Sequence, residues 1–282
     1  MRQSEHEPRD ITVYIERYDP ERDEQPRWRQ EYSLRVEPGM TVLDGLHAIK
    51  ESQDATLCYR FSCRMGVCGS CGMLINGRPA LACNTQILEV TNRVLTVAPM
   101  PNFDIVRDLV PDLSRFFEKH GSVLSHLRPQ DEQERDDPTG EYFQSPKQLL
   151  DYVQFSYCIR CGLCVSACPT VATDDSYLGP MALAQAHRYN ADTRDSGFDS
   201  RKQVVAARGG VFSCHYAGEC SNVCPKGVDP ARAIQLLKRE LVFDYLRLRR
   251  HREPAPVMGP PEHAERRPEI PEPPPHTVEP GE

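Results

Sequence analysis

The sequence of 282 residues predicts an α+β chain of two domains, an N-terminal domain built on a β-sheet and a C-terminal helical domain. Residues 11–15 alternate apolar and polar side chains as a half-buried strand does, whereas apolar residues from Gln148 onward favour helices. Eleven of the twelve cysteines fall into three closely spaced groups, the first at residues 63–83 and the others at 158–168 and 214–224. A chain of this length accommodates two modest domains.

The N-terminal domain is predicted at residues 10–105, after a polar tail at 1–9. Strands at 11–15 and 32–36 precede a helix that begins after Thr41, a residue type suited to the N-cap. After the first cysteine group, a strand at 72–75 leads into Asn76-Gly77, a strong hairpin signal, and a last strand follows at 94–97. The charged, proline-containing segment 106–144 is predicted to be a partly helical connector.

The helical domain is predicted at residues 145–252. Pro180 suits the first turn of one helix, and Asp229-Pro230 begins another whose apolar residues recur at helical spacing. Residues 253–282 are rich in proline and glutamate and poor in apolar side chains, so we expect a disordered tail there.

Composition narrows the function classes. A formal net charge of −7, spread along the chain, argues against nucleic acid as a partner. Apolar runs are far shorter than the roughly 20 residues that cross a bilayer, and the polar N-terminus is unlike a secretory signal. Cysteines two or three residues apart are better metal ligands than disulfide partners and imply a reducing compartment. We therefore expect a soluble protein on the cytoplasmic side of a membrane.

The first cysteine group has the plant-type spacing of a 2Fe–2S site, with x4, x2 and x11 between its members. Glycines in the loop let it wrap tightly and aim backbone N–H groups at sulfur. A structural zinc site also uses four cysteines and is the alternative, but the spacing favours the cluster. The expected ligands are Cys63, Cys68, Cys71 and Cys83.

The second group has the spacing of a bacterial ferredoxin, in which the fourth cysteine usually serves the other cluster of the domain. This rule assigns a 4Fe–4S cluster to Cys158, Cys161, Cys164 and Cys224. It leaves Cys168 to join Cys214 and Cys220. Ala217 stands where an ordinary run has another cysteine and cannot bind iron, so three thiolates predict a 3Fe–4S cluster.

The twelfth cysteine, Cys58, lies in the strand-like stretch TLCYRFS before the first group. We expect a buried cysteine without a role in the cluster. A replacement ligand or an oxidation-sensitive thiol is the alternative.

The motifs SCRMGVCGSCGMLINGRPALAC, CIRCGLCVSACPT and CHYAGECSNVCPKGVDP resemble the iron–sulfur subunit of succinate dehydrogenase and fumarate reductase, respiratory complex II. The resemblance covers about residues 10–250. It implies a β-grasp 2Fe–2S ferredoxin domain and an all-helical bacterial-ferredoxin-like domain.

The resemblance also implies partners and a role. A flavoprotein subunit with covalently bound FAD would oxidise succinate to fumarate, so no catalytic residue of that chemistry is expected here. Electrons would pass through 2Fe–2S, 4Fe–4S and 3Fe–4S to quinone, which membrane anchor subunits, often with haem b, help to bind. The chain would serve respiration and the tricarboxylic acid cycle as a peripheral protein on the cytoplasmic face of a bacterial inner membrane.

Near the quinone, the resemblance implies roles for Pro169, Thr170 and His215, although a solvent-facing histidine at a helix end is the simpler reading of His215 alone. Many succinate dehydrogenases carry a tryptophan where this chain has Ala172 or Thr173. Succinate oxidation is favoured. Fumarate reduction, a subunit like that of heterodisulfide reductase, and a zinc-binding structural module remain the alternatives.

Overall fold

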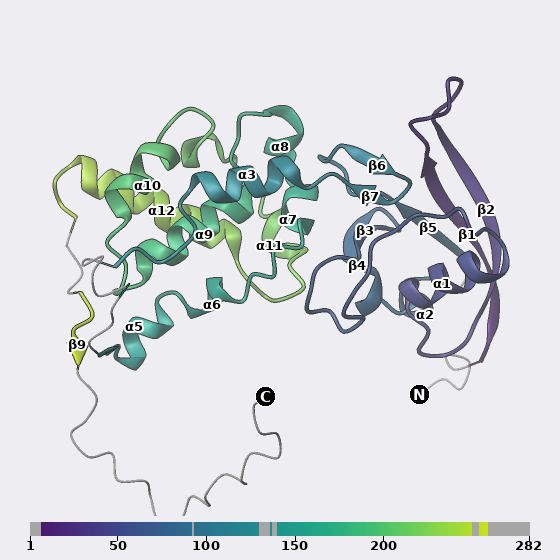
Figure 1. The fold of residues 1–282 in the computed structure, drawn as a ribbon, viewed down its shortest axis with the longest axis horizontal. Helices are drawn as coiled ribbons and strands as arrows, with labels where there is room; N and C mark the ends of the chain where they lie inside the picture. Colours follow the sequence, from purple (N-terminus) through teal and green to yellow (C-terminus); the bar gives the residue numbers. More distant parts are fainter. Residues whose placement is uncertain (1–6, 92, 130–135, 137–139, 250–253, 259–282) are drawn as a thin grey trace, which may run out of the picture.

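The computed structural model describes residues 7–91, 93–129, 136, 140–249 and 254–258. A β-sheet with short helices forms the N-terminal part, and helices form most of the remainder (Figure 1). The two parts lie end to end along the long axis of the molecule. This arrangement confirms the predicted α+β class. Within the described residues, no helix is both long and apolar enough to cross a membrane.

Five strands form the main sheet in the order β2-β1-β5-β3-β4. β1 and β5 are parallel, and the other neighbouring pairs are antiparallel. Ten residues of β1 pair with ten of β2, so both strands are longer than predicted. Their additional residues are mostly charged, which the apolar pattern does not register. The strands are β1 (Arg9–Tyr18), β2 (Arg27–Val36), β3 (Gly72–Ile75), β4 (Arg78–Leu81) and β5 (Val94–Ala98).

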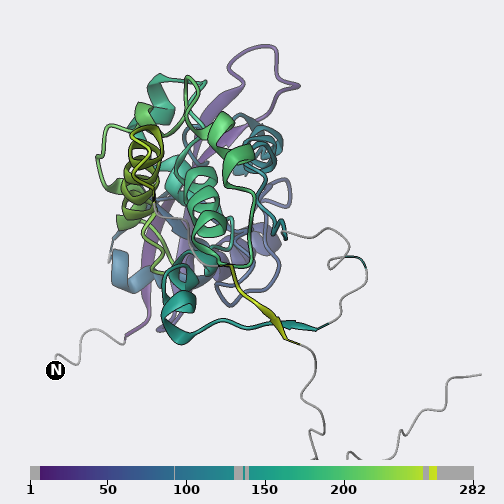
Figure 2. The same ribbon diagram turned by 90° about the vertical axis from the view of Figure 1, so that its left-hand side faces the viewer.

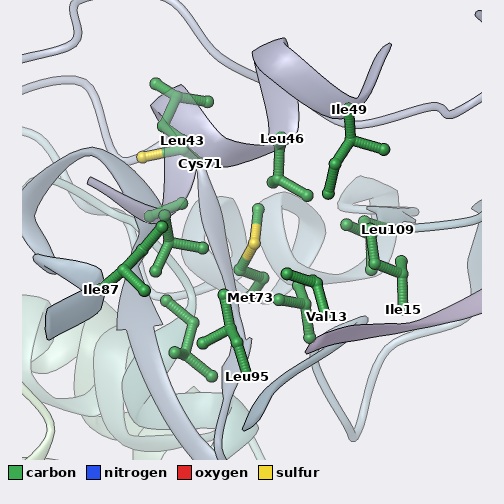
Figure 3. Close-up of a cluster of buried hydrophobic side chains, with 14 of the residues drawn as sticks. Val13, Ile15, Leu43, Leu46, Ile49, Cys71, Met73, Ile87, Leu95 and Leu109 are labelled. Atoms are coloured by element: carbon green, nitrogen blue, oxygen red, sulfur yellow. The ribbon is translucent and has the colours of Figure 1, made fainter. Parts of the chain in front are cut away.

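The core of this domain lies between the sheet and helix α1 (Val42–Ser52). Figure 3 shows Leu46 and Ile49 of α1 facing Met73 and strand β1. The predicted cap is confirmed: Thr41 and Asp44 form a reciprocal capping box at the start of α1. The short helix α2 (Ile87–Val90) adds Ile87 to the same core.

The predicted hairpin between β3 and β4 is also confirmed. Asn76 and Gly77 have φ angles of 46° and 78°, as a two-residue type I′ turn requires. The hairpin brings the chain back from Cys71 to the 3₁₀ helix η2 (Ala82–Asn84), which contains Cys83. The Ala82 N–H donates to the Cys71 carbonyl over 3.0 Å and closes this return.

The predicted connector begins within the N-terminal domain. β6 (Ile105–Arg107) and β7 (Val110–Pro111) form a small hairpin, and Leu109 is buried in the core of the sheet domain. Asp108 accepts a 2.8 Å hydrogen bond from the buried guanidinium of Arg17. The packing of this domain therefore continues past residue 105.

The next part of the segment packs against the helical domain. Helix α3 (Ser114–Ser122) contacts α9, and Lys119 donates to the carbonyls of Asp175 and Tyr177. Arg201, which is fully buried, donates to the carbonyls of Leu124 and His126. Residues 105–129 are thus held by both domains. Residues 130–135 and 137–139 of the predicted connector lie outside the described part of the chain.

The helical domain is built on the long helices α9 and α12, which pack against each other. Pro180 and Pro230 occupy their first turns, as predicted, and Asp229 caps α12. Around this pair lie shorter helices, several of only four or five residues. The bounds are α5 (Pro146–Leu150), α6 (Val153–Ser156), α7 (Leu163–Ser166), α8 (Pro169–Thr173), α9 (Pro180–Ala191), α10 (Phe198–Val205), η3 (Val211–Ser213), α11 (Glu219–Asn222) and α12 (Pro230–Tyr245).

The start of the predicted disordered tail is ordered. β9 (Val257–Met258) pairs with β8 (Glu141–Tyr142), and Figure 2 shows β9, in yellow, meeting β8 below the helices. Ala255 is buried and its N–H donates to the Thr193 carbonyl over 2.9 Å. Backbone pairing needs no apolar composition, so the prediction was wrong for residues 254–258. Residues 259–282, and residues 1–6 of the predicted N-terminal tail, lie outside the described chain.

Candidate iron–sulfur sites

The first cysteine group lies on a loop whose backbone N–H groups point at sulfur. Three of these groups converge on Cys63 Sγ, and Gly66 donates to Cys83 Sγ over 3.2 Å. Such donors stabilise a thiolate or a cluster sulfur that carries negative charge. The donors to Cys63 Sγ are Met65 at 3.5 Å, Val67 at 3.3 Å and Cys68 at 3.3 Å.

The four thiols of this group differ in their surroundings. Cys71 is buried in the sheet core, and this burial raises its pKa to about 12. Cys68 is exposed, and hydrogen bonds from the backbone of Cys63 and from Ser70 lower its pKa to about 6. The loop thus spans from the core to the surface of the domain.

The second set of predicted ligands lines one cavity in the helical domain. The cavity lies between α7, α9 and the start of α12. Burial raises the pKa of Cys161 to about 11 and that of Cys164 well above its ordinary value. The cysteines that line it are Cys158, Cys161, Cys164 and Cys224, the set expected for 4Fe–4S.

The third set lines a separate cavity. Cys168, Cys214 and Cys220 surround it, and Ala217 lies on its wall. Burial raises the pKa of Cys220 to about 11. The geometry therefore brings together the three cysteines predicted for 3Fe–4S.

Each set of residues fits a cluster of the predicted type. The cysteines of the second and third sets face cavities from several sides, and the sulfurs of the first receive backbone hydrogen bonds. Within the described parts of the chain, no group of three or more Cys, His, Asp or Glu side chains is arranged to hold a single metal ion. The donor sets are rich in thiols, the ligands that iron–sulfur clusters take.

Two of the three residues expected near quinone lie at the third cavity. Pro169, which is exposed, and Thr170, which is buried, both line it. His215 is exposed on the loop after Cys214 and is not part of the lining, whereas its neighbour Tyr216 is. Ala172 and Thr173 are exposed on α8.

The first and second sites meet directly at Gly69. A Cβ atom at Gly69 would lie only 2.8 Å from Cβ and 2.9 Å from Cα of Cys161, so only glycine fits this contact. Asn102 strengthens the junction, because its Nδ2 donates to the carbonyls of Val165, Ser166 and Cys168 at 2.9–3.1 Å. The sequence indicated a glycine-rich loop but gave no signal of this contact between domains.

Sequence analysis also missed Tyr177, which lines the third cavity. It lies outside every cysteine motif, so ligand spacing could not reveal it. Cys58 also differs from expectation. It is half-buried in an irregular segment rather than buried in a strand, and its thiol donates to the Thr56 carbonyl over 3.4 Å.

A sheet domain with one exposed cysteine loop and a helical domain with two cysteine-lined cavities define a two-domain ferredoxin-type electron carrier. Comparison with known families supports this class. A model described as "2Fe-2S iron-sulfur cluster binding domain" matches residues 12–118, and one described as "4Fe-4S dicluster domain" matches residues 154–228.

Relatives and a solved structure identify the family. The chain is 48% identical over 228 residues to the fumarate reductase iron-sulfur subunit of Mycobacterium tuberculosis, covering 81% of this chain and 91% of the relative. It is 37% identical to the mitochondrial succinate dehydrogenase [ubiquinone] iron-sulfur subunit of Candida glabrata, covering 84% and 93%. The structure titled "Mycobacterium smegmatis Sdh1 complex in the apo form" contains a similar chain, at a TM-score of 0.72 and 28% identity, covering 85% and 98%.

The chain belongs to the iron–sulfur subunits of fumarate reductase and succinate dehydrogenase. It is accordingly an electron-transfer subunit of an oxidoreductase complex, with a 2Fe–2S domain and a 4Fe–4S dicluster domain. The resemblance predicted from the three cysteine motifs is confirmed.

Proposed function

We propose that this chain carries single electrons from covalently bound FAD, in a flavoprotein subunit that oxidises succinate, to quinone at a membrane anchor. The observation that carries the proposal is the sequence of three adjoining cysteine sites. Gly69 of the first contacts Cys161 of the second, and Cys220 of the third lies close enough to Cys164 of the second to help raise its pKa.

The two cavities and the hydrogen-bonded cysteine loop support the following ligand sets. Cys63, Cys68, Cys71 and Cys83 hold 2Fe–2S; Cys158, Cys161, Cys164 and Cys224 hold 4Fe–4S; Cys168, Cys214 and Cys220 hold 3Fe–4S. Each cluster, when bound, supplies one-electron redox chemistry. The protein holds neighbouring sites in contact.

Exposed apolar side chains support a partner at each end. Met65, Val67 and Phe61 are exposed around the first site, and we assign this surface to the flavoprotein. Phe212 and Tyr216 are exposed around the third site, which we assign to the anchor and its quinone. Exposed apolar patches commonly mark protein or membrane contacts. In this proposal the chain lies on the cytoplasmic face of a bacterial inner membrane, where anchor subunits hold it.

Cluster content tests the assignment. Anaerobically purified complex should contain about nine irons per copy of this chain, two, four and three for the respective clusters, besides any haem iron. Oxidised complex should give the near-isotropic electron paramagnetic resonance signal of a 3Fe–4S centre. Zinc in place of iron, or ten non-haem irons without that signal, would contradict it.

Turnover in the reverse direction is the second candidate. The relatives at 48%, 41% and 40% identity are named fumarate reductase iron-sulfur subunits. Comparing succinate-driven quinone reduction with quinol-driven fumarate reduction in the same membranes decides between the two. We expect the former to be faster.

Substitution of His215 tests the proposed quinone site beside the third cluster. A histidine beside a ligand of the last cluster can donate a hydrogen bond or a proton to reduced quinone, because its imidazole N–H is a hydrogen-bond donor and a general acid. We expect His215→Ala to slow quinone reduction about tenfold or more, and to leave reduction of a dye that accepts electrons upstream nearly unchanged. Unchanged quinone reduction with intact clusters would show that the anchor subunits build the quinone site without His215.

A further inference from the structure

The hydroxyl of Tyr177 is a buried polar group whose role neither the family assignment nor the ligand sets explain. Tyr177 has no exposed surface, and its hydroxyl forms no hydrogen bond of ordinary geometry with any described residue. Leaving a buried hydroxyl without a partner costs free energy, typically about 1–3 kcal/mol. A side chain of this kind in a close-packed core points to a partner that binds there.

The structure shows which groups the hydroxyl faces. Tyr177 lines the third cavity together with its cysteines. Burial raises the pKa of Tyr177, and the thiol of Cys214 raises it further, followed by those of Cys168 and Cys220. The Tyr177 side chain therefore lies beside the three cysteines of this site. Of the three, Cys214 has the largest effect on the pKa of the hydroxyl.

The backbone of Tyr177 is fixed on both sides. Its N–H donates to the Asp174 carbonyl over 3.1 Å, and its own carbonyl accepts from Lys119 Nζ over 2.6 Å. The Leu178 N–H that follows donates to the Gly209 carbonyl over 2.8 Å. The ring is thus held against the cavity by contacts that do not depend on the hydroxyl.

We propose that the Tyr177 hydroxyl donates a hydrogen bond to the Cys214 sulfur when that cysteine binds iron, and thereby raises the reduction potential of the third cluster. A neutral thiol is a weak acceptor, whereas an iron-bound thiolate is a much better one. Reduction adds one negative charge to the cluster, so the hydrogen bond stabilises the reduced form more than the oxidised form. Hydrogen bonds to sulfur are among the factors that set cluster potentials. The proposal rests on the 3Fe–4S assignment made above.

Tyr177→Phe tests the proposal in the membrane-bound complex, because it removes the hydroxyl and keeps the ring. The 3Fe–4S signal would be followed by electron paramagnetic resonance during a redox titration. We expect the equilibrium constant for reduction to fall by up to about tenfold, which corresponds to about 59 mV for one electron. A proton coupled to the cluster, identified as exchangeable because its signal disappears in deuterated buffer, should be present in the parent and absent from the variant.

Tyr152→Phe is the matched control. Tyr152 is also buried in the helical domain, but its hydroxyl donates to Gln144 over 2.8 Å and it lines no cysteine cavity. We expect no shift in this variant. An unshifted potential in Tyr177→Phe with full iron content, or an equal shift in Tyr152→Phe, would overturn the role of Tyr177. A parent complex without any 3Fe–4S signal would instead overturn the cluster assignment.

Discussion

Cys68 and Cys164 show how differently the two domains hold their cysteines. Cys68 is exposed on a loop, and hydrogen bonds lower its pKa to about 6. Cys164 faces a cavity within the helical domain, where burial raises its pKa well above the ordinary value. The first site is thus arranged by local backbone donors, whereas the second is arranged by the packing of helices.

This difference has a consequence for stability. The apolar core of the sheet domain is one large cluster in which Cys71 is the single buried cysteine, and it extends to Leu163 and Val223 of the helical domain. In the helical domain the cysteines are themselves part of the apolar clusters, and α6, α7 and α11 have only four residues each. Helices of that length are unstable alone. We therefore expect the helical domain to depend on its clusters more than the sheet domain does.

Removing one ligand from each domain should give the largest contrast. Cys83→Ala should lose about two irons and leave the sheet domain folded, because its core is complete without the cluster. Cys224→Ala should lose about four irons and also destabilise the helical domain, since Cys224 ties the α11–α12 region to the loop of Cys158 and Cys161. Iron analysis and the helical circular dichroism signal measure the two effects. Equal losses of helical signal in both variants would show that the helical domain does not depend on its clusters more than the sheet domain does.

The third site is intermediate between the exposed first site and the second site, which is enclosed by helices. Cys220 is buried, but Ala217 is exposed on the outer wall of the cavity. Ala217→Cys should supply the missing ligand and raise the iron content by about one per chain, towards 4Fe–4S. The near-isotropic signal of the oxidised protein should fall accordingly. If the signal persists unchanged under iron-replete conditions, the grouping of Cys168, Cys214 and Cys220 is wrong.

The junction between the two domains gives a smaller effect. Gly69→Ala and Gly66→Ala place a side chain at φ angles of 76° and 67°, so both share a similar backbone strain. Only the Cβ at position 69 would collide with Cys161, because that at position 66 would lie 3.6 Å from Asn84. We expect Gly69→Ala to be less stable than Gly66→Ala by about 1–3 kcal/mol, measured from urea midpoints. Equal midpoints would show that the domain contact adjusts freely.

Sequence reasoning identified those parts of the molecule that short-range chemistry specifies. The capping box at Thr41, the turn at Asn76-Gly77 and the first turns at Pro180 and Pro230 each depend on a few neighbouring residues. The cysteine groupings follow from ligand spacing in the same way. These features could be predicted because no distant residue is needed to produce them.

The features that sequence reasoning missed depend on contacts between distant segments. Residues 105–129 look like a connector because they are charged, but Arg17 and Arg201 bind this segment from opposite domains. Gly69 meets Cys161, and Tyr177 reaches the third cavity, only once the chain has folded. A single sequence contains no pattern that pairs these residues.

Asp54 tests whether the sheet domain is stabilised by its own side chains, independently of the cluster. Burial alone would raise its pKa, but hydrogen bonds from Thr56, Tyr32 and Arg17 outweigh burial and hold the pKa well below its ordinary value. A depressed folded pKa stabilises the protein above the unfolded pKa of about 3.9, and this stabilisation is lost as the pH falls through the folded value. Asp54→Asn should therefore lower the free energy of unfolding by about 1 kcal/mol, equally from pH 8 to about pH 5, without changing iron content. Urea midpoints, followed by 2Fe–2S absorbance, measure this change in the free energy of unfolding.

The exposed pair Asp10–Arg35 supplies the control, since Asp10→Asn should change stability by less than about 0.5 kcal/mol. A loss of iron in Asp54→Asn would mean that the cluster and the core of the sheet domain are not independent.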